Sequence, residues 1–350
     1  MKLFNKKPKP STSTQTPTIP AWQLQAAYGG FPNPNRPELL AEMAKDSMIQ
    51  TSLTIKTLGV LASGWKVVGE SDQSDFVREA FSRMQGSVHT VLQNAMDAFV
   101  HGWSIQELVY GADGGKWWIQ SVRPKDSRYF TIEVDEYETT KSLKLNLPGE
   151  PEQSFSPDRF VIYRHRPGYG KPYGQSDLEA AMPHFREKKR LMEAWRVHLE
   201  KFASPTLLAK FGKGATSEDQ AAMLRSLEAL AKNSAIVFPE EFEVRALGDR
   251  DGASQGFMDA IEFHNREITR AILGQTLTTS EGTRVGSLAM GRVHLQVLLL
   301  QLEAIRRDLA DTVMNEQIIK PLVMLNFGRV EMPRFEFEQT PLSVFVTGQV

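Results

Sequence analysis

The stretch SDLEAAMPHFREKKRLMEAWRVHLEKFASP, residues 176–205, decides the fold class. Its large apolar side chains recur every three or four residues, or at the sum of the two, at Met182, Phe185, Met192, Trp195, Leu199 and Phe202. This spacing predicts a long helix with one apolar stripe. Ser176 and Asp177 are suited to cap its start, and Pro205 to end it. The basic run 186–190 is expected on the solvated face, in preference to a nucleic-acid contact.

More helix is predicted beyond this stretch, with a strand-containing insertion in between. The segments PTLLAKF and SAIVFPEEFEVRAL are expected to form short strands on either side of a helix at 218–232. A second helix should end at Gly274. After it, an apolar stripe at three–four spacing predicts a long helix, through Leu295, Leu298, Leu302, Ile305 and Leu309. Pro321 is expected to kink or break that helix.

Upstream of residue 176 the sequence mixes helix and strand. Residues 35–64 predict one helix, with Leu58 on its apolar stripe and Gly64 as its stop. In WSIQELVYGADGGKWWIQSVRP, Asp113-Gly114-Gly115 predicts the turn of a hairpin. Its neighbours Trp117 and Trp118 must face opposite ways, one towards the core and one towards an interface. RYFTIEV and FVIYRH are expected to continue the same sheet, which makes the fold class α+β.

Composition limits the function. Among 350 residues, 41 Lys+Arg balance 42 Asp+Glu, so the chain lacks the basic surplus of proteins that grip DNA by its phosphates. There is no cysteine, which excludes disulfides and thiolate metal sites. No apolar run approaches the ~20 residues of a membrane span, and the N-terminus lacks the apolar stretch of a secretory signal. Residues 1–20, rich in Pro, Ser, Thr and Lys, are expected to be a disordered tail.

Catalytic motifs are missing. The glycine-rich stretch ILGQTLTTSEGTRVGSLAMGRVH, residues 272–294, has no lysine and so cannot be a P-loop. GYGKPYG, residues 168–174, resembles a Rossmann fingerprint only in composition. The seven histidines show no HExxH or similar ligand spacing and are expected at the surface or in satisfied core positions. No GxSxG elbow occurs. No catalytic residue, cofactor or metal is therefore expected.

A series of stretches resembles the portal proteins of Mu-like tailed bacteriophages. In family order they are LLAEMAKDSMIQTSLTIKTLGVLASGWKV, HGWSIQELVY, KDSRYF, YGKPYGQSDLEAA, LEKFASPTLLAKF, ITRAILGQTLTT with GSLAMGRVH, and LVMLNFG. Each motif is weak alone, but their number and order are fairly specific, and they cover most of residues 35–337. Such portals usually continue well beyond the PRFEFE strand. Only a short tail follows it here, which puts a helical crown domain in doubt.

The resemblance implies a portal-like fold with a mixed α/β wing, long stem helices, a small clip domain and a channel loop. The implied segments are a tail at 1–20, the wing at 21–175, the first stem helix at 176–203, the clip at 204–255, the second stem helix at 256–274, the tunnel loop at 275–286, long wing or crown-side helices at 287–328 and a C-terminal strand and tail at 329–350.

The resemblance also implies a function without catalysis. Such proteins form a ring, usually of twelve subunits, that is the DNA entry and exit channel at one capsid vertex and docks the terminase motor. The implied partners are copies of the chain, the terminase large subunit, capsid and scaffold proteins, head-completion proteins and the double-stranded DNA in the channel, with no membrane. The implied location is the virion, after assembly in the host cytoplasm.

Site residues follow from the same resemblance. Those expected to face the channel and DNA are Gln275, Thr276, Thr278, Thr279, Ser280, Glu281, Thr283 and Arg284. Those expected to face the terminase are Lys210, Lys213 and Glu218. Those expected to pack the stem are Phe185, Met192, Trp195 and Leu199. Small and hydroxylated residues suit a mobile loop that touches DNA lightly.

Two other functions remain open from the sequence. The first is an enzyme with an unrecognised phosphate or nuclease site, which would show activity dependent on a metal or ATP. The second is a monomeric adaptor that binds DNA or protein, which would form no large ring.

Overall fold

The computed structural model describes most of the chain between residues 37 and 338. The described residues are 37–135, 139–168, 172–202, 206–210, 216–218, 220–222, 224–225, 243–247, 253–276 and 288–338. The predicted tail at 1–20 and most of the predicted tunnel loop lie outside them.

The chain divides into two compact units. The sheet unit comprises the described residues of 37–44, 54–177 and 299–338, and the hairpin unit comprises those of 45–53 and 178–298. Helices α3 (Ser47–Leu61) and α10 (Leu288–Asp308) each have residues in both units.

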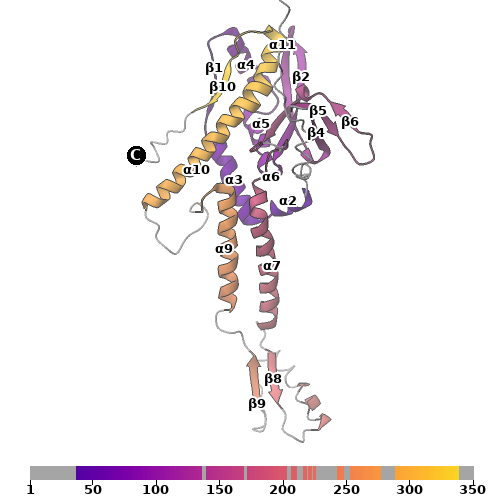
Figure 1. The fold of residues 1–350 in the computed structure, drawn as a ribbon, viewed down its shortest axis with the longest axis vertical. Helices are drawn as coiled ribbons and strands as arrows, with labels where there is room; N and C mark the ends of the chain where they lie inside the picture. The colour runs from indigo at the N-terminus through magenta and orange to yellow at the C-terminus, as the bar shows by residue number, and fades with distance from the viewer. Residues whose placement is uncertain are drawn as a thin grey trace, which may run out of the picture. The chain divides into compact units, whose positions relative to one another are not determined.

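Two three-stranded antiparallel sheets carry the core of the sheet unit (Figure 1). One has the order β3-β2-β7, from Lys116–Lys125, Trp103–Asp113 and Phe160–Arg164. The other has the order β4-β5-β6, from Phe130–Val134, Thr140–Leu145 and Gln153–Phe155. Side chains of both sheets form one buried cluster: Trp103, Ile105, Phe130, Ile132, Leu143, Phe160 and Ile162. The predicted hairpin is present, but β4 lies in a different sheet from β7, contrary to the prediction.

Helices α4 (Asp72–Arg83), α5 (Val88–Ala95) and α6 (Ala98–His101) contact strand β2 or β3, and the short turns η1 (Ser127–Tyr129) and η2 (Pro157–Arg159) contact β2. Helix α2 (Pro37–Met43) packs on α6. A third sheet pairs β1 (Trp65–Val68) with β10 (Arg334–Phe337). On β3, Trp118 is buried and packs on Phe76 of α4, whereas Trp117 is exposed. The prediction that these two rings face opposite ways is confirmed.

The helix predicted for residues 35–64 is two helices. The break lies at Asp46, whose Oδ1 accepts hydrogen bonds from the backbone amides of Met48 at 3.0 Å and Ile49 at 3.2 Å. This is the geometry of an N-terminal cap, so the carboxylate starts a new helix inside a sequence of otherwise helical period. Leu58 is exposed, not part of a buried stripe, and α3 ends at Leu61 before Gly64.

The helix after residue 288 does not break at Pro321. It runs from α10 through a π-helical segment, η3 (Leu309–Ile319), into α11 (Lys320–Phe327). The amide of Lys320 donates to the carbonyl of Asn315, five residues back. Pro321 has no amide hydrogen and follows this change of register in the first turn of α11, where a proline is tolerated. The predicted stripe is buried at Leu298, Leu302, Ile305 and Leu309.

Three carboxamide side chains of this helix cover strand edges. Strands β3, β7 and β10 each lie at the edge of their sheet, and each offers the amide and carbonyl of one residue to one carboxamide. The amides of Phe335, Ile162 and Trp117 donate to Asn315 Oδ1 (2.7 Å), Gln317 Oε1 (2.7 Å) and Asn326 Oδ1 (2.8 Å), and the same side chains donate back to the three carbonyls at 3.1, 2.8 and 2.9 Å. The three amides thus complete backbone pairing that would otherwise be open to another strand.

The hairpin unit is built on two long helices. Helix α7 spans Leu178–Phe202 and α9 spans Ala253–Leu273, and they run side by side in Figure 1. Between them in sequence, β8 (Thr206–Lys210) and β9 (Glu243–Leu247) form a two-stranded antiparallel sheet. Helical residues occur at 217–218, 220–222 and 224–225, within or next to the helix predicted from residue 218.

Candidate functional site

Burial in the α7–α9 hairpin is confined to one end. On α7 the buried side chains are Leu178, Ala181, Phe185 and Lys188, all in its first eleven residues. On α9 they are Ile268, Thr269, Ile272 and Leu273, all in its last six. The helices are antiparallel, so these two groups meet at the same end of the hairpin. The other end has no buried side chain among its described residues.

That other end exposes large apolar side chains. Met192 and Leu199 on α7 are 51% and 42% exposed, and Met258 on α9 is 51% exposed. Trp195 is half-buried, and its indole N–H has no acceptor among the described residues. The predicted stem-packing stripe therefore splits: Phe185 packs within the chain, whereas Met192 and Leu199 do not. A pair of helices has only one shared seam, so a stripe as wide as this one needs a further surface to cover it.

A buried ion pair holds the packed end together. Lys188 Nζ lies 2.7 Å from Asp46 Oδ2, and both side chains are nearly inaccessible. Asp46 therefore has two roles, because its other oxygen caps α3. The prediction of a solvated face for residues 186–190 is wrong for Lys188, since the carboxylate that neutralises it lies 142 residues away in sequence.

A second ionic cluster lies in the sheet unit, at the residue directly before α7. The carboxylate of Asp177 is fully buried, and Lys56 Nζ, His165 Nε2 and Arg166 Nη1 lie at 2.5, 3.1 and 3.3 Å from it. The side chains of Lys56 and His165 are also buried, whereas that of Arg166 is half exposed. Lys56 Nζ further lies 4.7 Å from the ring centre of Phe99.

Burial sets the protonation of this cluster. Burial would raise the pKa of Asp177, but hydrogen bonding to His165 and the charge of Lys56 outweigh it, so the pKa is lowered. Burial lowers the pKa of Lys56 and that of His165, against the effect of Asp177. His165 is then neutral near pH 7. Its Nε2 must carry the hydrogen, because an ionised carboxylate only accepts.

The backbone around this cluster is tightly folded. The amide of His165 donates to Gly102, that of Gln175 to His165, and that of Asp177 to Phe99. Gly102 has φ 82°, and a Cβ there would lie 2.9 Å from the carbonyl oxygen of Tyr173. Arg166 takes φ 48°, a conformation that costs energy for a residue with a side chain. These contacts fix the backbone from which α7 starts.

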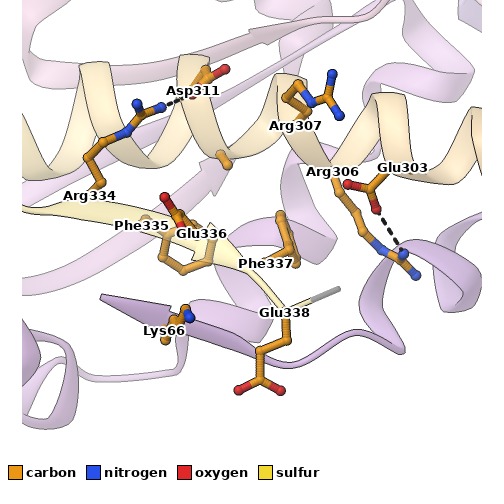
Figure 2. A pocket seen from close by; sticks show the side chains of 11 residues that line it. Lys66, Glu303, Arg306, Arg307, Asp311, Arg334, Phe335, Glu336, Phe337 and Glu338 are labelled. Atoms are coloured by element: carbon orange, nitrogen blue, oxygen red, sulfur yellow. Dashed lines mark hydrogen bonds and ion pairs between the residues drawn. The ribbon is translucent and has the colours of Figure 1, made fainter. Parts of the chain in front are cut away.

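A groove of mixed charge lies between β10 and the helical segment around residues 303–311 (Figure 2). It is lined by the cations Lys66, Arg306, Arg307 and Arg334 and the carboxylates Glu303, Asp311, Glu336 and Glu338. Arg334 pairs with Asp311 at 3.0 Å, and Arg306 with Glu303 at 3.5 Å. The formal charge of this lining is zero. Such a groove suits a protein surface of alternating charge better than a phosphate backbone.

Two of the residues predicted to face a channel fall within the described residues. Gln275 is buried, with 2% of its surface exposed, so it cannot face a channel and the prediction is wrong for it. The preceding Gly274 has φ 70°, which turns the chain at the end of α9. Thr276 is half-buried. Thr278, Thr279, Ser280, Glu281, Thr283 and Arg284 lie outside the described residues.

The residues predicted to face the terminase are spread over the segment between α7 and α9. Lys210 ends β8, Glu218 is exposed on a helical turn, and Lys213 lies outside the described residues.

Two chemical features are missing from the described part of the chain. It contains no group of three or more histidine or carboxylate side chains placed to hold a metal ion. None of its helices has both the length and the apolar character needed to cross a bilayer.

The sequence is similar to portal proteins of Mu-like bacteriophages. A family described as "Portal protein of Mu bacteriophage" matches residues 37–343. Mu-like prophage FluMu protein gp29 of Haemophilus influenzae is 26% identical over 89% of the chain and 62% of its own length. The portal protein of Escherichia phage Mu is 23% identical over 81% of the chain and 55% of its own length. The chain thus spans little more than half the length of these two relatives.

Solved structures share the fold at low sequence identity. The neck of an empty gene transfer agent particle, computed with C6 symmetry, contains a chain with a TM-score of 0.62 and 13% identity, covering 86% of this chain and 84% of its own. The neck of the native particle, computed with C12 symmetry, gives a TM-score of 0.61, 13% identity and coverage of 86% and 83%. An HK97 family phage portal protein from Corynebacterium diphtheriae gives 0.50 at 12% identity, with coverage of 91% and 98%. The predicted α+β portal fold is confirmed.

Proposed function

Because the chain belongs to the portal protein family of Mu bacteriophage, we propose that it is a structural subunit of a ring that forms the DNA channel at one capsid vertex. The ring has closed rotational symmetry, which requires each subunit to present two different complementary surfaces to its neighbours. The subunit does no chemistry. Its place is the virion, after assembly in the host cytoplasm, with capsid, scaffold and head-completion proteins around it.

The observation that carries this proposal is the unburied end of the α7–α9 hairpin. Met192, Leu199 and Met258 expose apolar surface that a monomer in water would leave uncovered. In a ring, the same hairpin of each neighbouring copy supplies the missing surface. A further copy is the best-matched partner, because the necks with a similar fold have six-fold or twelve-fold symmetry.

The near-zero net charge of the chain favours a channel that DNA passes through over a protein that binds DNA tightly. The whole chain has a formal net charge of −1. A protein that neutralises many phosphates binds DNA tightly and holds it in place. A channel must let DNA pass, so we propose that the segment at 276–286, with its hydroxyl side chains, makes weak and replaceable contacts with the moving duplex.

The segment between α7 and α9 is the proposed docking point for the terminase large subunit. It contains a small two-stranded sheet and an exposed helical turn at Glu218. Replacing Lys210, Lys213 and Glu218 together should weaken terminase binding and leave the ring intact. Unchanged terminase binding by this variant would place the docking surface elsewhere.

Imaging of the purified full-length chain tests the function. Negative-stain micrographs should show rings with a central hole, and light scattering should give a mass of about twelve subunits, the usual number for closed portal rings. A monomer of about 39 kDa at all concentrations would support the adaptor reading instead. Activity dependent on a metal or ATP in the ring-free chain would support an enzyme.

Arg284 provides a test of the channel loop. It is the one cation in the sequence 275–286, and a ring would repeat it around the pore. Arg284→Glu should shorten the packaged DNA while ring size stays unchanged. Lysine at Thr278 and Thr279 should slow translocation more at low salt than at high salt. If both variants package DNA like the parent at every salt concentration, this loop does not face DNA.

A further inference from the structure

The α7–α9 hairpin carries charged side chains along the two sides on which its helices face away from each other. The helices meet at His184 and His264, whose ring centres lie 5.4 Å apart. Successive residues of an α-helix are about 100° apart around its axis. A residue two, five or six positions from either histidine therefore points at least about 120° away from the other helix. Every charged side chain at such a position is exposed.

On α7 these charged residues form a row that we call the α7 edge, and they are Glu179, Arg186, Lys189 and Arg190. The carboxylate lies five residues before His184, towards the packed end of the hairpin. The three cations follow His184 by two, five and six residues. With a rise of 1.5 Å per residue, they lie about 3 to 9 Å from the level of the histidine contact, towards the unburied end.

On α9 the corresponding row, the α9 edge, consists of Asp259, Glu262, Arg266 and Arg270. Its carboxylates precede His264 by five and two residues, and its cations follow His264 by two and six. Because α9 runs antiparallel to α7 (Figure 1), these carboxylates lie towards the unburied end, at about the heights of the α7 cations. The α9 cations lie towards the packed end, on the side of Glu179. The two edges therefore have opposite charges at similar heights.

Within one chain the two edges cannot meet, because they lie on opposite sides of the hairpin. Their charges are also weakly engaged. Arg190 pairs with Glu187 at 3.3 Å in an exposed position, and Arg270 pairs with Glu267 while more than half exposed. No ion pair joins Arg186, Glu262 or Arg266 to another residue in the part of the chain that the structure describes.

We propose that the α7 edge of each copy in the ring pairs with the α9 edge of the next copy. The inference rests on the proposed function and adds the two surfaces that meet. Copies related by rotation about one axis stand at the same height and in the same direction, so an α7 edge and a neighbouring α9 edge face each other with opposite charges level.

This pairing gives the contact a direction. Arg186 and Lys189 of one copy lie against Glu262 and Asp259 of the next. One exposed ion pair contributes little stability. Two α7 edges that stand side by side in the same direction would instead bring like charges together, and such juxtaposition suppresses the wrong arrangement. Each copy can therefore join the next only through two different surfaces, as a closed ring requires.

Reversing the charge of one edge at a time tests the pairing in the full-length chain. The α7 variant carries Arg186→Glu and Lys189→Glu, and the α9 variant carries Asp259→Lys and Glu262→Lys. Each variant alone brings like charges together at every contact, so neither should form rings at a concentration at which the parent does. An equal mixture should form rings again, because a reversed α7 edge then meets a reversed α9 edge. Negative-stain images and light scattering measure both results.

The matched control is Lys141→Glu/Arg329→Glu. It changes the net charge as the α7 variant does, but at two exposed positions of the sheet unit, and should form rings like the parent. Circular dichroism checks that each variant is folded. The proposed pairing is overturned if either edge variant alone forms rings like the parent, or if the mixture stays without rings. A parent that forms no ring overturns the proposed function too, which distinguishes the two failures.

Discussion

The strand edges of the sheet unit are covered by side chains of the same chain, whereas the unburied end of the α7–α9 hairpin is not. At the strand edges, Asn315, Gln317 and Asn326 satisfy backbone groups that could otherwise pair with another chain. At the hairpin, Met192 and Leu199 stay exposed and the N–H of Trp195 lacks an acceptor among the described residues. The comparison indicates that the chain closes off the strand edges against association and leaves the hairpin open to it.

The largest effect should come from a charge at the open end of the hairpin. Trp195→Asp places a carboxylate where the proposed ring buries an indole, and an unpaired charge in such a contact costs several kcal/mol. Because Trp195 is only half-buried in the single chain, the subunit should stay folded while rings are lost. Light scattering and circular dichroism measure the two effects. Trp195→Phe, which keeps the apolar bulk, should still form rings, and normal rings from Trp195→Asp would contradict the proposal.

The next effect concerns the buried cluster before α7. Lys56→Met removes the closest cation of the fully buried Asp177. Breaking a buried pair from one side should lower the free energy of unfolding by about 3 kcal/mol, measured by urea denaturation. Lys320→Met, in the exposed pair with Glu316, is the control and should change it by less than about 0.5 kcal/mol. Equal effects of the two substitutions would mean that water reaches Asp177.

Smaller effects should distinguish the strand-edge caps. Asn315→Leu leaves the amide and carbonyl of Phe335 without partners in a part-buried position, at a cost of about 2 kcal/mol. Asn326→Leu acts on Trp117, where water can replace the lost bonds, so its cost should be under about 1 kcal/mol. Thermal unfolding of both variants measures the difference. If Asn326→Leu destabilises the protein more than Asn315→Leu, the exposed edge at Trp117 depends more on its side-chain hydrogen bonds than the part-buried edge at Phe335 does.

The smallest effect should be a pH dependence from His165. An unfolded chain protonates this ring near pH 6.5, and burial in the folded chain moves its pKa lower. Between those values the unfolded chain binds more protons, so acid favours unfolding. His165→Gln, which can still donate to Asp177, should flatten the fall in stability as the pH drops below about 6.5. His89→Gln should keep the parent profile, and an unchanged profile for His165→Gln would assign the acid sensitivity to other groups.

Local signals in the sequence predict much of the fold. The Asp113-Gly114-Gly115 turn, the opposite faces of Trp117 and Trp118, and the stripe through Leu302 and Leu309 depend on near neighbours, and all are found. The fold family required the whole ordered series of motifs, because each motif alone fits many helical proteins.

Local signals do not predict which residues far apart in the sequence come together. The sequence predicts a solvated Lys188 because its partner Asp46 lies 142 residues away. It predicts β4 and β7 in one sheet because the alternation of a strand does not show which other strand it pairs with. Pro321 looked like a helix break because the change to a π-helical register depends on packing of the segment as a whole. The split of the stem stripe between Phe185 and Met192 likewise depends on which helix ends meet.

Because Asn315, Gln317 and Asn326 all lie on one helical segment, local unfolding of this segment would expose three strand edges. If η3 and α11 open together as one cooperative unit, strands β3, β7 and β10 lose their covers in the same event. Three free edges on one molecule are templates for strand exchange between molecules. The rate at which the amides of Trp117, Ile162 and Phe335 exchange hydrogen with solvent should therefore track the rate at which the stored protein aggregates.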